Sequence, residues 1–133
     1  MAMLDRRMVT MMVSSCLFIC SCTRTGAIPD VTVVGYDCIG EYDPLSDYQS
    51  AVEKVVRRLK RETHSHGYNY LTYDVTGNSK CFGQGICDSQ LSGDECMYCL
   101  GAADVKLMIR CYFPVRALMI LRECLLKYQE VIL

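Results

Sequence analysis

The chain has 133 residues, with 14 basic side chains, 15 acidic side chains and ten cysteines. This length suits a single domain. The nearly neutral charge argues against a protein that binds nucleic acid through bulk electrostatics. The sequence contains no G-x-S-x-G, H-E-x-x-H or phosphate-loop motif, so we expect neither an enzyme nor a cofactor.

Residues 1–27 have the features of a secretory signal peptide. Two arginines precede an uncharged, largely apolar run over residues 8–22, and Ala27 suits a signal-peptidase site. The run is short for a membrane span, and no later run is long enough to cross a bilayer. We therefore expect residues 28–133 to form one domain that is secreted to the extracellular space and does not insert into a membrane.

A helix is predicted in the first half of this domain. Its apolar side chains recur at intervals of three and four residues, as on one face of a helix: Tyr48, Val52, Val55, Val56 and Leu59. Ser46 is a suitable N-cap, and Gly67 marks the end of the pattern. The valine-rich residues 28–40, which precede the helix, alternate in character and predict a strand.

Further β-structure is predicted in the second half. Residues 68–75 alternate and are rich in β-formers, and residues 80–87 return after a turn at residues 76–79. Near the C-terminus, residues 117–131 form one long β-like stretch. These segments predict an antiparallel hairpin followed by strand structure at the end of the chain.

A second helix is predicted between the hairpin and the last stretch. Ser92 and Glu95 match a capping box, and the helix should extend to about Ile109. The order of elements is therefore strand, helix, hairpin, helix and strand. This order predicts an α+β fold, in which two α-helices pack on one antiparallel β-sheet of about five strands.

Seven cysteines follow the predicted signal peptide: Cys38, Cys81, Cys87, Cys96, Cys99, Cys111 and Cys124. In an oxidising compartment, closely spaced cysteines form disulfides more often than zinc sites, so we expect no metal ion here. The odd number leaves one cysteine that is unpaired or pairs outside the chain. Spacing alone does not decide the connectivity, because six cysteines allow many pairings.

The cysteine spacing resembles that of a known plant family. The run from Cys87 to Cys99 has the pattern C-x8-C-x2-C, Tyr68-Asn-Tyr precedes it, and Cys124 opens a C-x-x-x-Y motif. Together these motifs resemble the ginkbilobin-homologous domain of land plants, also called the stress-antifungal or cysteine-rich-repeat secretory domain. The resemblance covers about residues 31–131. It implies three disulfides, Cys38–Cys111, Cys87–Cys96 and Cys99–Cys124, and leaves Cys81 as a free thiol.

The resemblance also identifies three positions that hold mannose in the family through Asn, Arg and Glu side chains. In this chain the positions are Ile39, Leu118 and Gln129, so all three depart from the family pattern. The two aliphatic side chains cannot form hydrogen bonds with a sugar hydroxyl. Arg116 lies two residues from the arginine position, on the same face of a strand but displaced by about 7 Å, and is not an obvious substitute.

The resemblance implies a secreted cysteine-rich plant protein of the apoplast, acting in defence or stress response as an extracellular binding module. Its partner would be an unidentified extracellular protein or glycan, and the altered sugar positions favour a protein. Two alternatives remain open. One is a mannose-binding antifungal lectin-like protein with a rearranged site, and the other is a structural homodimer linked through Cys81. We favour a buried, inert thiol at Cys81 over such a link.

Overall fold

The computed structural model describes residues 28–132, and the predicted signal peptide lies outside them. The helices are α2 (Asp47–Glu62) and α3 (Gly93–Arg110), with a short 3-10 helix, η2 (Thr63–His66), after α2. The strands are β1 (Val33–Ile39), β2 (Asn69–Thr76), β3 (Ser79–Cys87), β4 (Arg116–Leu121) and β5 (Cys124–Val131). All five strands form one antiparallel sheet in the order β1-β4-β5-β3-β2.

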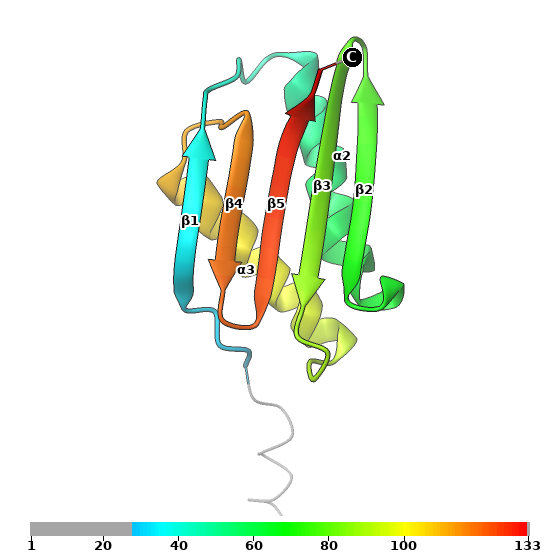
Figure 1. The fold of residues 1–133 in the computed structure, drawn as a ribbon, viewed down its shortest axis with the longest axis vertical. Helices are drawn as coiled ribbons and strands as arrows, with labels where there is room; N and C mark the ends of the chain where they lie inside the picture. The colour runs from blue at the N-terminus through cyan, green and yellow to red at the C-terminus, as the bar shows by residue number, and fades with distance from the viewer. Residues whose placement is uncertain (1–27, 133) are drawn as a thin grey trace, which may run out of the picture.

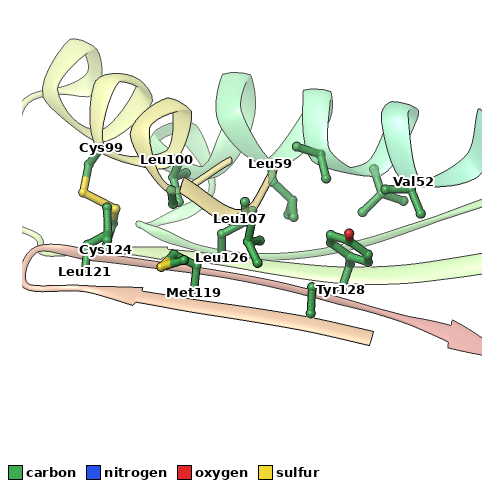
Figure 2. Packing of buried hydrophobic residues seen from close by; sticks show 14 of the residues in the cluster. Val52, Leu59, Cys99, Leu100, Leu107, Met119, Leu121, Cys124, Leu126 and Tyr128 are labelled. Carbon is green, nitrogen blue, oxygen red and sulfur yellow. A yellow bond between two sulfur atoms is a disulfide. The ribbon is translucent and has the colours of Figure 1, made fainter. Parts of the chain in front are cut away.

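Both helices cover the same face of this sheet, and the opposite face is turned toward the viewer in Figure 1. The hydrophobic core lies between the two layers, with Leu59 of α2, Leu100 of α3 and Leu126 of β5 fully buried in it (Figure 2). The predicted α+β class, with two helices on an antiparallel sheet and three disulfides, is confirmed.

The predicted apolar face of α2 is the face that packs on the sheet. Its members Tyr48, Val52, Val55, Val56 and Leu59 are all buried. Ser46 occupies the N-cap position, but its hydroxyl donates to the Asp43 carbonyl at 2.6 Å rather than capping the helix. Gly67 follows η2 with a φ of 68°, a left-handed conformation that glycine adopts readily.

The C-terminal β-like stretch is two strands rather than one. β4 and β5 pair with each other, with Ile120 opposite Leu125, and the chain reverses between them. The reversing residues Arg122 and Glu123 are not typical of tight turns, which explains why the sequence pattern continues through them. Neighbouring segments hold the turn instead: the Arg122 amide donates to the Thr32 carbonyl and the Asp88 amide donates to the Glu123 carbonyl.

Helix α3 begins at the predicted capping box and is joined covalently to the sheet. The Glu95 amide donates to the Ser92 hydroxyl at 3.2 Å, and the Ser92 amide donates to the Glu95 carboxylate at 2.9 Å. Residues 28–132 contain three disulfides, Cys87–Cys96, Cys99–Cys124 and Cys38–Cys111, the pairs that the family resemblance implied. They connect the start, middle and end of α3 to β3, β5 and β1.

Candidate functional site: the open face of the sheet

The sheet face opposite the helices is broad and mostly apolar. We call it the open face, because no described segment covers it (Figure 1). Its apolar members come from all five strands: Ile39, Leu71, Tyr73, Val75, Phe82, Ile86, Leu118, Ile120, Leu125 and Val131. Each lies at a strand position that alternates with a helix-facing one.

The apolar character is strongest at the β2 edge. Leu71, Tyr73 and Val75 remain 55%, 57% and 49% exposed, although each is large and hydrophobic. Tyr73 pairs directly with Phe82 across β2 and β3, and the Lys80 ammonium lies 4.5 Å from the Tyr73 ring centroid. A contiguous exposed patch of this kind marks an interaction surface more often than a scattered apolar residue does.

The structure brings the three sugar-site positions implied by the family resemblance onto this face. Ile39 lies on β1, Leu118 on β4 and Gln129 on β5. Arg116 is the cross-strand partner of Ile39 on one side and of Gln129 on the other. Arg116 therefore lies in the same cross-strand row as Ile39 and Gln129, two of the three positions. Its separation of two residues from Leu118 along β4 does not by itself reveal this.

A hollow of about 290 Å³ lies beside these positions. Its polar lining consists of Asp37, Arg116, Lys127 and Gln129, and its apolar lining includes Phe82, Leu118 and Leu125. In the next row, Leu118 lies between Asp37 and Lys127. Among residues 28–132, neither Arg116 nor Lys127 forms an ion pair, so both cations keep their hydrogen-bond donors free.

The polar members of the hollow could bind a polar group, since Arg116 and Lys127 donate, Asp37 accepts and Gln129 does both. Of these four residues, the family resemblance points to Gln129 alone, and the sequence pattern identifies neither Asp37 nor Lys127 as a site residue. Alternation along β1 and β5 is enough to place Asp37 and Lys127 on the open face. The sequence does not reveal the order of the strands, which places β1 and β5 on either side of β4 and so brings these two side chains together.

Cys81 lies on the helix-facing side of β3 and is completely buried. Burial raises the pKa of its thiol to about 12, so the sulfur stays protonated at neutral pH. A disulfide between two copies would require the core to open. This location does not support the homodimer linked through Cys81.

Two further observations concern ions and membranes. Across residues 28–132, no three His, Cys, Asp or Glu side chains are grouped so that they could hold a metal ion. In the same part of the chain, neither helix is both long and apolar enough to span a bilayer.

Comparison with known proteins agrees with the fold and with the family resemblance. A family model described as salt stress response/antifungal matches residues 36–131. The chain is 24% identical over 91 residues to cysteine-rich repeat secretory protein 1 of Arabidopsis thaliana, covering 68% of this chain and 27% of that protein. It is 26% identical over 86 residues to putative cysteine-rich repeat secretory protein 5 of the same plant, covering 65% and 32%.

Two solved structures share the fold, both of them tandem DUF26 ectodomains of Arabidopsis thaliana cysteine-rich receptor-like proteins. PDLP8 matches with a TM-score of 0.67 and 18% identity, covering 75% of this chain and 49% of that one. PDLP5 matches with a TM-score of 0.65 and 16% identity, covering 73% and 49%. The chain thus spans about half of each tandem ectodomain and about a third or less of the curated relatives. Because the family model covers most of its length, the chain belongs to the salt stress response/antifungal family of plant cysteine-rich secretory domains.

Proposed function

We propose that this chain is a secreted binding module of the plant apoplast that acts in defence or stress response, with residues 1–27 as its cleaved signal peptide. Its recognition surface is the open face, and its partner is an extracellular protein. The names of the relatives support an extracellular location, since they are secretory proteins and receptor-like ectodomains. The fold supports a binding role, because a small rigid sheet presents one face without a covering layer.

The observation that carries this proposal is the exposed apolar strip of Leu71, Tyr73 and Val75 beside the polar hollow. Protein interfaces commonly combine an aromatic and aliphatic centre with a charged rim. Tyr73 and Phe82 supply the aromatic centre, and Lys80 and Lys127 supply charge around it. A sugar site would instead need paired donors and acceptors at the positions that Ile39 and Leu118 occupy.

A mannose-binding, lectin-like function is the second candidate, and one observation favours it. Arg116 lies in the row between Ile39 and Gln129, and Asp37 and Lys127 line the same hollow. A rearranged sugar site could use these four polar side chains. We place it second because Leu118, between Asp37 and Lys127, would desolvate sugar hydroxyls without offering them a partner.

The protein-binding proposal can be tested by capture from apoplastic fluid. The full chain is expressed in a secretory host, purified in oxidised form and immobilised, and its partner is the protein whose capture excess soluble wild type competes away. Tyr73→Glu introduces a charge at the centre of the strip. It should reduce capture by about tenfold or more, because it removes an aromatic anchor from the centre of the interface and buries a carboxylate there, whose loss of hydration costs free energy even beside Lys80.

Val105→Glu is the matched control, since Val105 lies on α3 and is 51% exposed, close to the 57% of Tyr73. This variant should capture the same partner as the wild type. If Tyr73→Glu retains full capture, or if both variants lose it equally, the open face is not the recognition surface.

A further inference from the structure

The other side of the molecule contains a second hollow, which neither the family's sugar positions nor the open face includes. It lies between α2 and α3, beside the loop that follows α3, and its volume is about 380 Å³. We call it the helix groove. Its apolar lining includes Val56, Leu107, Phe113 and Pro114. The volume is near the lower end of the range for small-molecule sites, about 300–1,000 Å³, and suits a molecule with one ring.

Aromatic packing and a disulfide hold one end of the helix groove in shape. The Tyr42 ring makes edge contacts with Tyr48 at 4.9 Å and with Phe113 at 5.6 Å between centroids. The Tyr42 amide donates to the Phe113 carbonyl at 2.8 Å, and the Cys38–Cys111 disulfide joins the end of α3 to β1. A site that is already formed costs less to order when a ligand binds.

A tyrosine hydroxyl without a hydrogen bond lies at the floor of the helix groove. Tyr128 is only 7% exposed. Its side chain extends from β5 toward the helices, and the hydroxyl oxygen is the part nearest to them (Figure 2). The neighbouring Tyr42 hydroxyl bonds to Gln49 and the Tyr48 hydroxyl bonds to the Val115 carbonyl. In the described part of the chain, the Tyr128 hydroxyl has no such partner. Because Tyr128 lines the groove, its unpaired hydroxyl is available to a ligand there.

Burial determines the protonation state of this hydroxyl. It raises the pKa of Tyr128 well above the ordinary tyrosine value, so the group remains a neutral donor and acceptor at physiological pH.

The rim of the helix groove carries one cation that no acidic side chain neutralises. The Lys60 ammonium pairs with the Asp104 carboxylate at 2.9 Å, which links α2 to α3. Glu53, on the same rim, accepts a hydrogen bond from Gln49 at 2.9 Å and keeps its negative charge. Arg57, also on the rim, is exposed and forms no ion pair with any residue from 28 to 132. Its guanidinium is therefore free to bind a carboxylate with two hydrogen bonds.

We propose that the helix groove binds a small aromatic carboxylate that carries a ring hydroxyl. The ring packs against Tyr42, Leu107 and Phe113, its hydroxyl bonds to Tyr128, and its carboxylate pairs with Arg57. This site is independent of the proposed function of the open face, because it lies across the core from it.

NMR titration of the oxidised, secreted full chain with 4-hydroxybenzoate tests this inference. We expect saturable shifts at Leu107 and Phe113, with none at the open face. The uncharged 4-hydroxybenzamide should bind at least about tenfold more weakly, because a hydrogen bond to a charged group is stronger than a neutral one. Cyclohexanecarboxylate, which lacks the flat ring, should also bind more weakly.

Two variants test the proposed Arg57 and Tyr128 contacts one at a time, and a third variant is the control. Arg57→Gln should weaken 4-hydroxybenzoate binding about tenfold, and Tyr128→Phe should weaken it severalfold while leaving benzoate, which lacks the hydroxyl, unaffected. Arg61→Gln, one turn further along α2 and outside the groove, should bind like the wild type. Absence of saturable shifts up to about 10 mM ligand, shifts confined to the open face, or equal affinities of Arg57→Gln and Arg61→Gln would each overturn the proposal.

Discussion

At the scale of single residues, burial controls the chemistry of Cys81, the one unpaired cysteine among residues 28–132. Cys81 faces the helices from β3 and has no exposed surface, and the raised pKa of its thiol, about 12, keeps it in the unreactive protonated form. Burial also raises the pKa of the Tyr42 hydroxyl to about 12. Cys81 is therefore an inert part of the core, and the Tyr42 hydroxyl stays protonated at neutral pH.

The raised pKa of Cys81 predicts a loss of stability in alkali. The thiol of the unfolded chain releases its proton near pH 9, whereas the folded thiol releases it near pH 12. Between these values the folded state binds more protons, so the free energy of unfolding falls as the pH rises. The slope for this one group is about 1.4 kcal/mol per pH unit, and its contribution to stability is fully present below pH 9.

Urea unfolding of the wild type and of Cys81→Ala at several values between about pH 9 and 11 measures this slope. As the pH rises, the free energy of unfolding should fall more steeply for the wild type than for the variant. The difference between the two slopes should correspond to about one proton. Burial is the largest cause of the raised pKa values of Tyr42, Tyr48 and Tyr128, and it remains in the variant, so most of their effect cancels in the comparison. Equal slopes would show that the Cys81 thiol titrates normally in the folded state.

At the scale of elements, the closeness of α2 to the sheet depends on two glycines of β3. A Cβ atom at Gly83 would lie 2.4 Å from a methyl group of Val55, and one at Gly85 would lie 2.5 Å from the Thr63 hydroxyl. Both distances are shorter than van der Waals contact. The helix can therefore pack on β3 because these two positions lack side chains.

Gly83→Ala should consequently destabilise the domain by about 1–3 kcal/mol, because the added methyl group forces α2 away from the sheet. Gly101→Ala is the matched control in α3, where nothing lies within 4 Å of the added atom. It should stabilise the domain by about 0.5–1 kcal/mol, as alanine favours a helix interior. Chemical denaturation measures both changes, and a neutral Gly83→Ala would mean that α2 is less tightly packed than the structure shows.

Sequence patterns identified the elements whose signals are local. The apolar spacing predicted α2, the capping box at Ser92 predicted the start of α3, and alternation predicted the β2–β3 hairpin. The reversal at Arg122 and Glu123 was not visible, because contacts from Thr32 and Asp88 hold it. The open-face hollow and the helix groove depend on strand order and helix packing. Pairings between distant segments create both, and no local pattern records such pairings.

At the scale of the whole molecule, a thin two-layer domain presents two different surfaces on opposite sides of one core. The three disulfides all join α3 to the sheet, so they fix the layer that carries the helix groove to the layer that carries the open face. They span 73, 9 and 25 residues of sequence. Long closed loops restrict the unfolded chain most, so Cys38–Cys111 should contribute most, about 4 kcal/mol.

Reduction of all three disulfides should therefore unfold the domain near physiological temperature. A domain of this size has a free energy of unfolding of only about 5–15 kcal/mol, and each lost disulfide removes about 2–5 kcal/mol. Thermal melting with and without a strong reductant measures the effect. An unchanged melting temperature, with complete reduction verified by thiol labelling, would show that the core alone maintains the fold.

Restoring the family's sugar-binding side chains should give the open face an affinity for mannose. The triple change of Ile39→Asn, Leu118→Arg and Gln129→Glu restores the side chains that the family uses for mannose. Because all three positions lie on neighbouring strands of the same face, this variant should gain measurable mannose affinity. A variant that folds like the wild type but shows no gain would mean that further residues are needed to build the sugar site.

We propose that the open face contacts an extracellular protein and does not recognise mannose. Ile39 and Leu118 leave sugar hydroxyls unpaired, at about 1–3 kcal/mol each, which is most of the roughly 4 kcal/mol of binding at millimolar affinity. NMR titration of the oxidised wild-type chain with mannose tests this directly, through the amide signals of Asp37, Arg116 and Gln129. We predict no saturable shifts up to about 10 mM mannose. Saturable shifts of these signals at submillimolar mannose would contradict the claim and make the lectin the leading function.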